Sequence, residues 1–376
     1  VTGIQDTLLI SEAVDIGGRY TFSAVSSWNW ADPSGFFENI FKPTSDSASV
    51  SPAATLYFDA RPSKDLRIFG KSSISYPFDT QDDSRDFEDV IEIKELFSDF
   101  TWNDRVYFRG GKHAINWGVG YFFSPADLLN ITEINPEDPD AEPEGPVSLK
   151  THVPINSHNL YLYFIANNIK AVDEIGIAAK SELAFGALEL GLGALYMKGA
   201  APAAMLTVSF PIWDVDMFVE AVMKYGSDRT FVEEIPVTLE TPFGLNTVTF
   251  EEDLFYHATA GFSFMYSSDE MESSVNMTGQ YLYNGEGYIN QSVLKDNGPG
   301  VFALIGAEEL NFSDVMNTGL HYAAVSAGWN GILGSDLSLQ AFWLQNFSDM
   351  SGYVSPSLSI RPFDGLSLSL STPYRY

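Results

Sequence analysis

The sequence contains no cysteine among its 376 residues. This absence excludes disulfide frameworks, thiolate metal sites and cysteine nucleophiles, although it does not identify a cellular compartment. Basic residues are also scarce, because 20 lysines and arginines stand against 50 aspartates and glutamates, for a formal net charge of −30. Contact with nucleic-acid phosphates needs basic surface, so we expect no nucleic-acid partner.

Long apolar runs are missing as well. No stretch of about 18 uninterrupted apolar residues occurs, so the sequence predicts no membrane-spanning helix. The richest segment, IGIAAKSELAFGALELGLGALYM, is interrupted by Lys180, Glu182 and Glu189. The chain opens at Val1 without a basic start and an apolar segment, so we expect any secretory signal to have been removed or never to have been present.

Apolar and aromatic residues are plentiful, and they alternate with polar ones. They make up 45% and 14% of the chain, a mixture that favours an ordered protein whose acidic residues collect in particular places. In DVDMFVEAVMKYG, apolar residues occupy every odd position from Val215 to Tyr225, whereas Asp216, Glu220 and Lys224 occupy even positions. The charges alone would also fit a helix, but the apolar set shares one face only in a strand.

The same alternation recurs along the chain and predicts many strands. Short turns such as WNDR and FPIWD separate some of them, and these turns alternate with longer connections around 31–48, 78–88, 118–146, 227–252 and 287–316. The strands are predicted near 14–30, 49–60, 66–77, 89–102, 105–117, 146–156, 158–168, 175–186, 188–199, 203–213, 214–227, 253–267, 271–286, 317–331, 335–347, 352–362 and 365–376.

Two all-β architectures fit such a pattern, a soluble sandwich and a membrane barrel. Strands longer than usual, aromatic residues near strand ends and long connections on one side favour the barrel. We therefore predict one domain, residues 1–376, that forms a transmembrane antiparallel β-barrel of about 16 to 18 strands. The predicted segments give an odd count, whereas bacterial barrels have even counts, so either one hairpin is misassigned or a final strand lies outside this sequence.

The segment RVYFRGGKHAINWGVGYFFSPADLLN carries the strongest local signal for a site. Arg105 and Arg109 share one parity and Lys112 has the other, and a charge on the lipid face near mid-membrane costs roughly 2–4 kcal/mol. A bulge at Gly110 and Gly111 would reset the register. It would turn a basic row toward the lumen, Arg105, Arg109, Lys112 and Asn116, and turn His113, Ile115 and Trp117 outward.

The following connection contains the acidic stretch NPEDPDAEPEGP. Its carboxylates are Glu137, Asp138, Asp140, Glu142 and Glu144, and four prolines stiffen it. Residues 118–146 form the third outer loop of the predicted barrel, and we consider three interpretations of it. The loop folds into the lumen as a constriction opposite the basic row, it is a solvated surface loop, or its carboxylates hold Ca²⁺.

Charged residues on the polar faces of other predicted strands indicate a hydrated lumen. An alternative is that these residues mainly connect neighbouring strands by cross-strand pairing. Sixteen or more strands would leave an aqueous interior that side chains alone cannot fill. The residues concerned are Lys71, Lys180, Glu182, Asp216, Glu220 and Lys224.

Two features carry a resemblance to a known family. A long third loop after the fifth strand resembles the arrangement of general bacterial porins, and a basic strand ending in INWG followed by SPADLLN resembles segments of porin-like outer-membrane families. The resemblance implies a diffusion channel and allows a homotrimer.

The sequence gives little support for a catalytic site. The five histidines are scattered, and the HExxH, GxSxG and GxxxxGK[ST] motifs are missing. We therefore expect no enzyme and no cofactor, but an outer-membrane channel for passive diffusion of small hydrophilic solutes, with a cation bias from the acidic excess. The alternative is a structural or interaction barrel plugged by its loops. Expected partners are outer-membrane lipid and lipopolysaccharide, with export through the periplasm and removal of a signal peptide.

Overall fold

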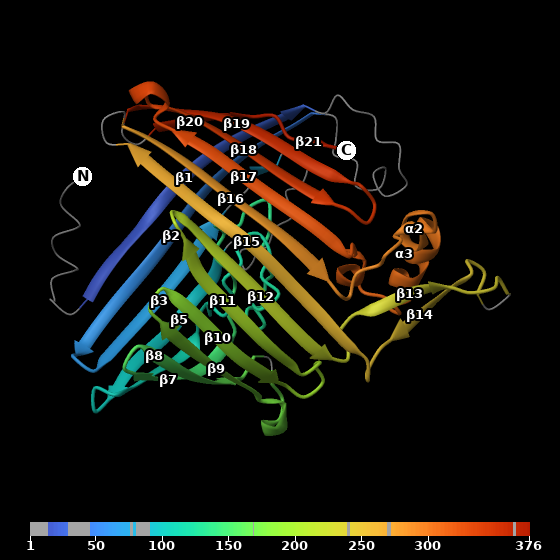
Figure 1. Ribbon diagram of the computed structural model, residues 1–376, viewed down its shortest axis with the longest axis horizontal. Coiled ribbons are helices and arrows are strands. Elements are labelled where there is room, and N and C mark those ends of the chain that lie inside the picture. The colour runs from blue at the N-terminus through green and yellow to red at the C-terminus, as the bar shows by residue number, and fades with distance from the viewer. Residues whose placement is uncertain are drawn as a thin grey trace. The chain divides into compact units, whose positions relative to one another are not determined.

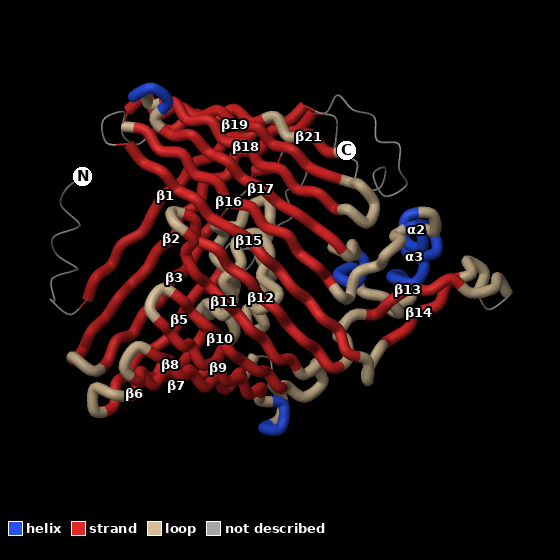
Figure 2. The backbone as a smooth tube through the Cα atoms, in the orientation of Figure 1, coloured by secondary structure: helices blue, strands red, loops and turns tan. Residues whose placement is uncertain are grey.

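The computed structural model describes residues 14–28, 46–75, 78–79, 91–167, 169–238, 241–268, 272–363 and 366–376. In these segments one sheet contains 19 strands and a separate hairpin contains two (Figures 1 and 2). Two of the 19, β4 (Phe78–Asp79) and β21 (Tyr374–Arg375), are two-residue segments, which leaves 17 longer strands. The prediction of an all-β fold is confirmed.

Contacts divide the chain into two compact units, and the first contains residues 1–115, 144–154 and 161–175. Its strands β1 to β7 pair in chain order and antiparallel, apart from the short β4, which lies beside β2. A 3₁₀ turn, η2 (Val172–Glu174), lies after the last strand of this unit. The longer strands are β1 (Val14–Trp28), β2 (Asp46–Ser63), β3 (Leu66–Ser75), β5 (Ile91–Trp102), β6 (Val106–Lys112), β7 (Val147–Ile155) and most of β8 (His158–Ile165).

The second unit contains residues 116–143, 155–160 and 176–376. Its strands also pair antiparallel with their neighbours in the chain, and one connection holds the separate hairpin β13 (Thr230–Glu234) and β14 (Leu245–Thr249). The sheet strands are β9 (Gly176–Phe185), β10 (Leu188–Tyr196), β11 (Ala203–Ile212), β12 (Val215–Tyr225), β15 (Leu254–Ser268), β16 (Ser273–Asn284), β17 (His321–Asn330), β18 (Leu337–Asn346), β19 (Gly352–Phe363) and β20 (Leu366–Ser371).

Each predicted strand segment coincides with a strand of the sheet, and the long connections carry extra structure. The connection predicted at 227–252 holds the hairpin β13–β14. That at 287–316 holds α2 (Ser292–Lys295), α3 (Gly298–Gly306) and the 3₁₀ turn η3 (Phe312–Val315), and a further 3₁₀ turn, η4 (Ile332–Gly334), precedes β18. The connections predicted at 31–48 and 78–88 lie mainly outside the described residues. No helix in the described segments is long and apolar enough to cross a membrane.

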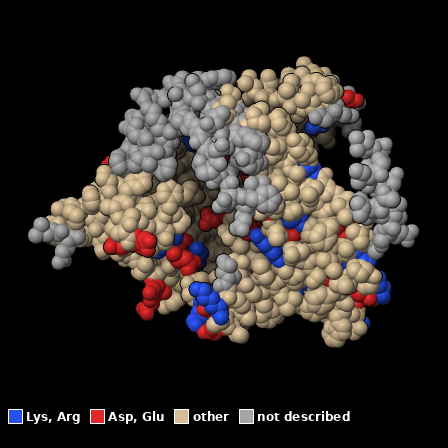
Figure 3. Space-filling view, turned by 180° about the vertical axis from the view of Figure 1, so that it is seen from behind, with Lys and Arg blue, Asp and Glu red and all other residues tan. Residues whose placement is uncertain are grey.

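The strands have one apolar and one polar face, as the alternation predicts. On β12, Val219 and Met223 are 37% and 42% exposed, whereas Glu220, on the other face, is fully buried. Leu192 on β10 and Tyr281 on β16 are similarly exposed, and wide areas of the surface in Figure 3 carry no charged side chain. A sandwich would bury such apolar faces in its core. Their exposure is what a sheet facing lipid requires.

The predicted bulge at Gly110 and Gly111 is wrong. Residues 109–112 pair one to one with both neighbouring strands, and β6 ends at Lys112 instead of continuing to residue 117. The chain then leaves the sheet, so Lys112 needs no register change to avoid lipid. The outward orientation expected for the next residues is also wrong, because they are buried: His113 is 1%, Ile115 3% and Trp117 0% exposed.

Candidate functional site

The polar face of the second unit carries a row of buried polar side chains on adjacent strands. The register places Thr207 of β11 beside Glu220 of β12, and Glu220 beside Thr259 of β15. Gln280 lies on β16, the next strand, and Lys180 lies on β9. All five are less than 9% exposed, although no second sheet covers them in the described part of the chain. What covers several of them is the loop that follows β6.

Glu220 binds this loop through its carboxylate. Oε1 accepts hydrogen bonds from the backbone amides of Val119 (2.5 Å) and Gly120 (2.6 Å) and from Ser124 Oγ (2.9 Å). Oε2 accepts one from the backbone amide of Ala126 (2.9 Å). A buried carboxylate is costly unless donors surround it, and here the loop supplies them.

Gln280 binds the next stretch of the loop. Its Oε1 accepts from the backbone amides of Tyr121, Phe122 and Phe123 at 3.1, 2.7 and 3.3 Å. Its Nε2 donates to the carbonyl oxygen of Phe123 (2.5 Å) and to Thr259 Oγ1 (2.6 Å). Both ends of the amide are therefore satisfied. We call Glu220 and Gln280 the clasp, and residues 117–126 the clasped segment.

Lys180 adds a third attachment at the start of the clasped segment. Its Nζ donates to the carbonyl oxygen of Trp117 (2.8 Å) and lies 2.9 Å from Glu182 Oε1 on the same strand. Trp117 is completely buried. Sequence reasoning placed Lys180 and Glu182 on the polar face but gave Lys180 no loop partner.

Two glycines allow the clasped segment to approach so closely. A Cβ atom on Gly118 would lie 2.6 Å from Glu220 Oε1, and one on Gly120 would lie 2.9 Å from Gln280 Nε2 and closer still to the Phe123 carbonyl oxygen. Side chains larger than hydrogen therefore do not fit at either position. The spacing of these glycines in NWGVGYFF was the sequence signal that could have indicated a close backbone contact.

An apolar contact supports the polar one. Phe122 and Phe123 are 1% and 9% exposed and pack with Tyr322 and Ala324 of β17. The ring of Phe122 lies 5.5 Å from that of Phe342 on β18, centroid to centroid. The polar face therefore includes an apolar patch that the loop covers, a feature that parity alone did not predict.

Asp127 follows the clasped segment and is the one charged residue of 116–130. Its two carboxylate oxygens accept hydrogen bonds from Asn130 Nδ2 at 2.8 and 2.9 Å. Burial raises the pKa of Asp127 to about 6, the Asn130 hydrogen bond opposes that change, and the nearby charge of Glu220 adds to it.

The acidic stretch does not form one cluster, and one of its residues contacts the clasped segment. Glu137, Asp138, Asp140 and Glu142 are exposed. Glu137 lies 3.3 Å from Arg375, and Asp140 accepts from Tyr121 Oη at 3.2 Å. In the first unit, Glu144 pairs with Lys112 at 2.7 Å. The part of the loop that is bound to the polar face of the second unit is thus residues 116–130, in which Asp127 is the one charged residue.

The predicted basic row does not form one row on a single strand. Arg105 is exposed in the turn before β6, and Asn116 is exposed in the loop. Only Arg109 and Lys112 lie within β6. The pore-lining role of these four residues stays a prediction.

Arg109 belongs to a network of ion pairs in the first unit. It donates to both oxygens of Asp99 on β5, at 2.6 and 3.0 Å, and its guanidinium carbon lies 4.0 Å from the ring centre of Phe97. Arg67 of β3 lies 3.4 Å from Asp99 and 2.9 Å from Asp59 of β2. The arginines are thus largely neutralised by carboxylates on neighbouring strands.

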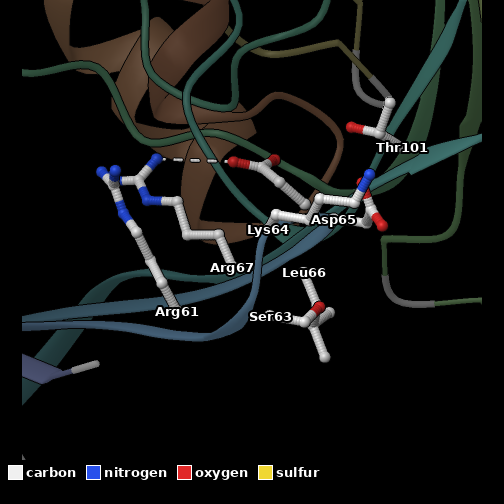
Figure 4. A pocket seen from close by; sticks show the side chains of 8 residues that line it. Arg61, Ser63, Lys64, Asp65, Leu66, Arg67 and Thr101 are labelled. Atoms are coloured by element: carbon white, nitrogen blue, oxygen red, sulfur yellow. Dashed lines mark hydrogen bonds and ion pairs between the residues drawn. The ribbon is translucent and has the colours of Figure 1, made fainter. Parts of the chain in front are cut away.

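A shallow pocket of about 470 Å³ lies beside this network, at the turn that joins β2 to β3 and next to the last residues of β5. In Figure 4 the guanidinium groups of Arg61 and Arg67 lie side by side in it. Arg61 also pairs with Asp59, at 3.2 Å. The residues that line the pocket are Arg61, Ser63, Lys64, Asp65, Leu66, Arg67, Asp99 and Thr101.

The remaining predicted lumen charges have different surroundings. Lys71 lies opposite Glu95 of β5 in the register, and Asp216 is exposed on β12. Lys224 lies 3.2 Å from Glu286, whose other carboxylate oxygen accepts from Ser227 Oγ.

Glu286 lies just beyond β16 and is 4% exposed. His257 Nε2 is 3.1 Å from its Oε2. Burial alone would raise the pKa of Glu286, but the interactions with His257, Lys224 and Ser227 outweigh burial and lower it to about 2. Sequence reasoning missed Glu286, and it also missed the loop-binding role of Gln280. In the described segments no three histidines, aspartates or glutamates gather as metal ligands.

Solved structures of similar fold include a bacterial porin. OccAB1 of Acinetobacter baumannii superposes with a TM-score of 0.51 and 12% identity over 97% of this chain and 91% of that one. OccK2 (OpdF) of Pseudomonas aeruginosa, solved with glucuronate, gives 0.51 and 9% over 97% and 92%. A BenF-like porin of Pseudomonas fluorescens Pf-5 gives 0.52 and 8% over 97% and 94%. No family model and no curated protein sequence matches the chain.

The likeness shows the fold. The chain has the fold of a transmembrane antiparallel β-barrel, like that of these solved structures, as its strand alternation predicted. The polar face of its strands is therefore the lumen face, and the exposed apolar face contacts lipid.

Proposed function

We propose that the protein is an outer-membrane channel through which small hydrophilic solutes diffuse passively. The observation that carries the proposal is the clasped segment, which lies on the polar face of strands in a porin-like barrel. A loop in this position narrows an aqueous lumen without covering the sheet from outside. The barrel then supplies the path, and the loop limits the size of the solute.

We further propose a preference for cations. Acidic residues outnumber basic ones by 50 to 20, and the described arginines of the first unit's network are paired with carboxylates. The acidic side chains of residues 137–142 are exposed, and their negative charge would raise the local concentration of cations. The OccK2 structure contains glucuronate, an anionic solute, so the sign of selectivity needs a direct measurement.

Planar lipid bilayers test the proposal. We expect purified protein to give stable single-channel steps, and a salt gradient to give a reversal potential of the sign for cation permeation. Steps with a reversal potential of the opposite sign would reject the cation preference but keep the channel. A correctly folded sample without steps would reject the channel.

A second candidate is a structural or interaction barrel whose lumen is plugged. The packing of Phe122 and Phe123 against Tyr322 and Phe342 favours it, because an apolar contact of this kind excludes water locally. Liposome swelling separates the two candidates, since a plugged barrel admits no small sugar at all.

Membrane partners and assembly follow from the same proposal. The exposed apolar face would contact outer-membrane lipid and lipopolysaccharide, after export through the periplasm and removal of a signal peptide. A homotrimer is the assembly that the porin resemblance suggests. Chemical cross-linking in native outer membranes tests it, and a single monomer band would reject it.

A further inference from the structure

Glu220 makes its hydrogen bonds to the loop and not to the strands around it. Its four described donors are Val119, Gly120, Ser124 and Ala126, all in the clasped segment. A lumen carboxylate that served to connect strands would instead pair with a cation across the sheet. The position of Glu220 thus matters for the loop and much less for the sheet.

Gln280 acts on the same segment by a different route. Its Oε1 accepts hydrogen bonds from three successive backbone amides, and its Nε2 donates one to the Phe123 carbonyl oxygen. Gln280 therefore binds the backbone of the loop and not its side chains. Its remaining donor goes to Thr259, whose own hydroxyl donates to the Tyr281 carbonyl oxygen at 2.7 Å. The amide is thereby fixed in one orientation by the sheet and can fix the loop in turn.

We propose that Glu220 and Gln280 are the positioning residues of the constriction: they hold the clasped segment against the lumen face and so set the cross-section of the channel. This inference rests on the proposed function. The two side chains need no contact with the solute. They act through the loop, whose distance from the strands they determine.

Two variants with matched controls test the inference. Glu220→Gln replaces an acceptor oxygen by a donor facing the loop amides, and Gln280→Leu removes every hydrogen bond of the amide. Asp216→Asn is the control for the first, because Asp216 lies on the lumen face of the same strand and is exposed. Gln340→Leu on β18 is the control for the second, because Gln340 is also exposed.

Amide hydrogen exchange measures the position of the loop directly. We expect exchange in residues 119–126 to become faster on the order of 10-fold to 100-fold in Glu220→Gln and Gln280→Leu, and to stay unchanged in both controls. Exchange in the strands reports whether each variant is folded. If the loop exchanges at the wild-type rate in folded Glu220→Gln and Gln280→Leu, the proposal is overturned.

Thiol labelling gives a second measurement that does not depend on exchange. Because the chain has no cysteine, Ala126→Cys places a single thiol at a position that is fully buried. A water-soluble methanethiosulfonate should modify it slowly in the otherwise native chain and at least 10-fold faster when Glu220→Gln is added. Equal rates would also overturn the proposal.

Single-channel recording then connects the loop to the cross-section. We expect larger conductance or frequent transitions between levels in the two clasp variants, wild-type conductance in Gln340→Leu, and no new transitions between levels in Asp216→Asn, which removes a predicted lumen charge but leaves the clasp intact. A released loop with unchanged conductance would show that the clasp does not set the constriction. A wild-type protein that forms no channels would reject the proposed function, while exchange and labelling would still test whether the clasp holds the loop.

Discussion

The two halves of the loop after β6 differ in charge and in contacts. Residues 116–130 contain one charged residue, are mostly buried or half-buried, and are contacted by side chains from five strands. Residues 131–143 contain five acidic residues and are mostly exposed. The half with a single charged residue is thus the half that is fixed in position. The charge that fixes it belongs to the strand, as Glu220, and the loop contributes backbone amides.

This difference predicts that apolar contacts of the first half matter most. Phe122→Ala should lower the free energy needed to release the loop by about 3–5 kcal/mol, as deletion of a buried ring does. Limited proteolysis in detergent should then cut within residues 117–130. Phe250→Ala is the matched control, because Phe250 packs with Phe231 and Phe255 away from this loop. Equal cleavage of this loop in both variants would contradict the prediction.

The next largest effect should come from a substitution at Gly120, where the backbone of the loop closely approaches Gln280. Gly120→Ala should destabilise the clasped position by about 1–3 kcal/mol, because the added methyl group meets the Phe123 carbonyl oxygen and Gln280. The exchange rate of the amides of residues 121–123 measures it. Gly306→Ala, in a helix with open space around the added atom, should leave those amides unaffected. A loop that tolerates Gly120→Ala would mean that Gln280 is not in close contact.

The sequence predicted the faces of the strands better than the partners of their residues. The parity of DVDMFVEAVMKYG placed Glu220 on the polar face, because strand alternation has a fixed period of two. No period encodes the path of a loop, so its contact with Glu220 and Gln280 could not be predicted. The prediction of a bulge was wrong for a related reason. The cost of placing Lys112 on the lipid face would apply only if the strand continued past this residue, whereas the chain leaves the sheet there and Glu144 neutralises the lysine.

A change in pH should also distinguish the two halves of the loop, with a smaller effect than the two substitutions above. The pKa of Asp127 is raised from 3.8 to about 6 in the folded loop, so the folded loop favours the protonated acid. The resulting stabilisation is complete below the pKa of the free acid and is lost as pH rises through about 6. Between pH 7.5 and pH 5 the first half should become more protected on the order of 10-fold.

Hydrogen exchange of residues 117–130, corrected for the intrinsic pH dependence of exchange, measures this change. Asp127→Asn should abolish the pH dependence and keep the loop protected at pH 7.5. A pH dependence that survives in Asp127→Asn would assign the effect to another group.

The smallest structural effect should come from the acidic half, and it tests the comparison most directly. Changing Glu137, Asp138, Asp140 and Glu142 to their amides removes negative charge from side chains that are exposed. The exchange rates of residues 117–126 should then stay close to the wild-type value, because the described hydrogen bonds of Glu220 and Gln280 involve none of these carboxylates, and an amide at position 140 can still accept the hydrogen bond from Tyr121 Oη. The reversal potential should move toward weaker cation preference, by an amount that decreases with added salt, since exposed charges are screened. An unchanged reversal potential would show that the acidic half does not line the permeation path. Faster exchange in the first half would show that the two halves are coupled.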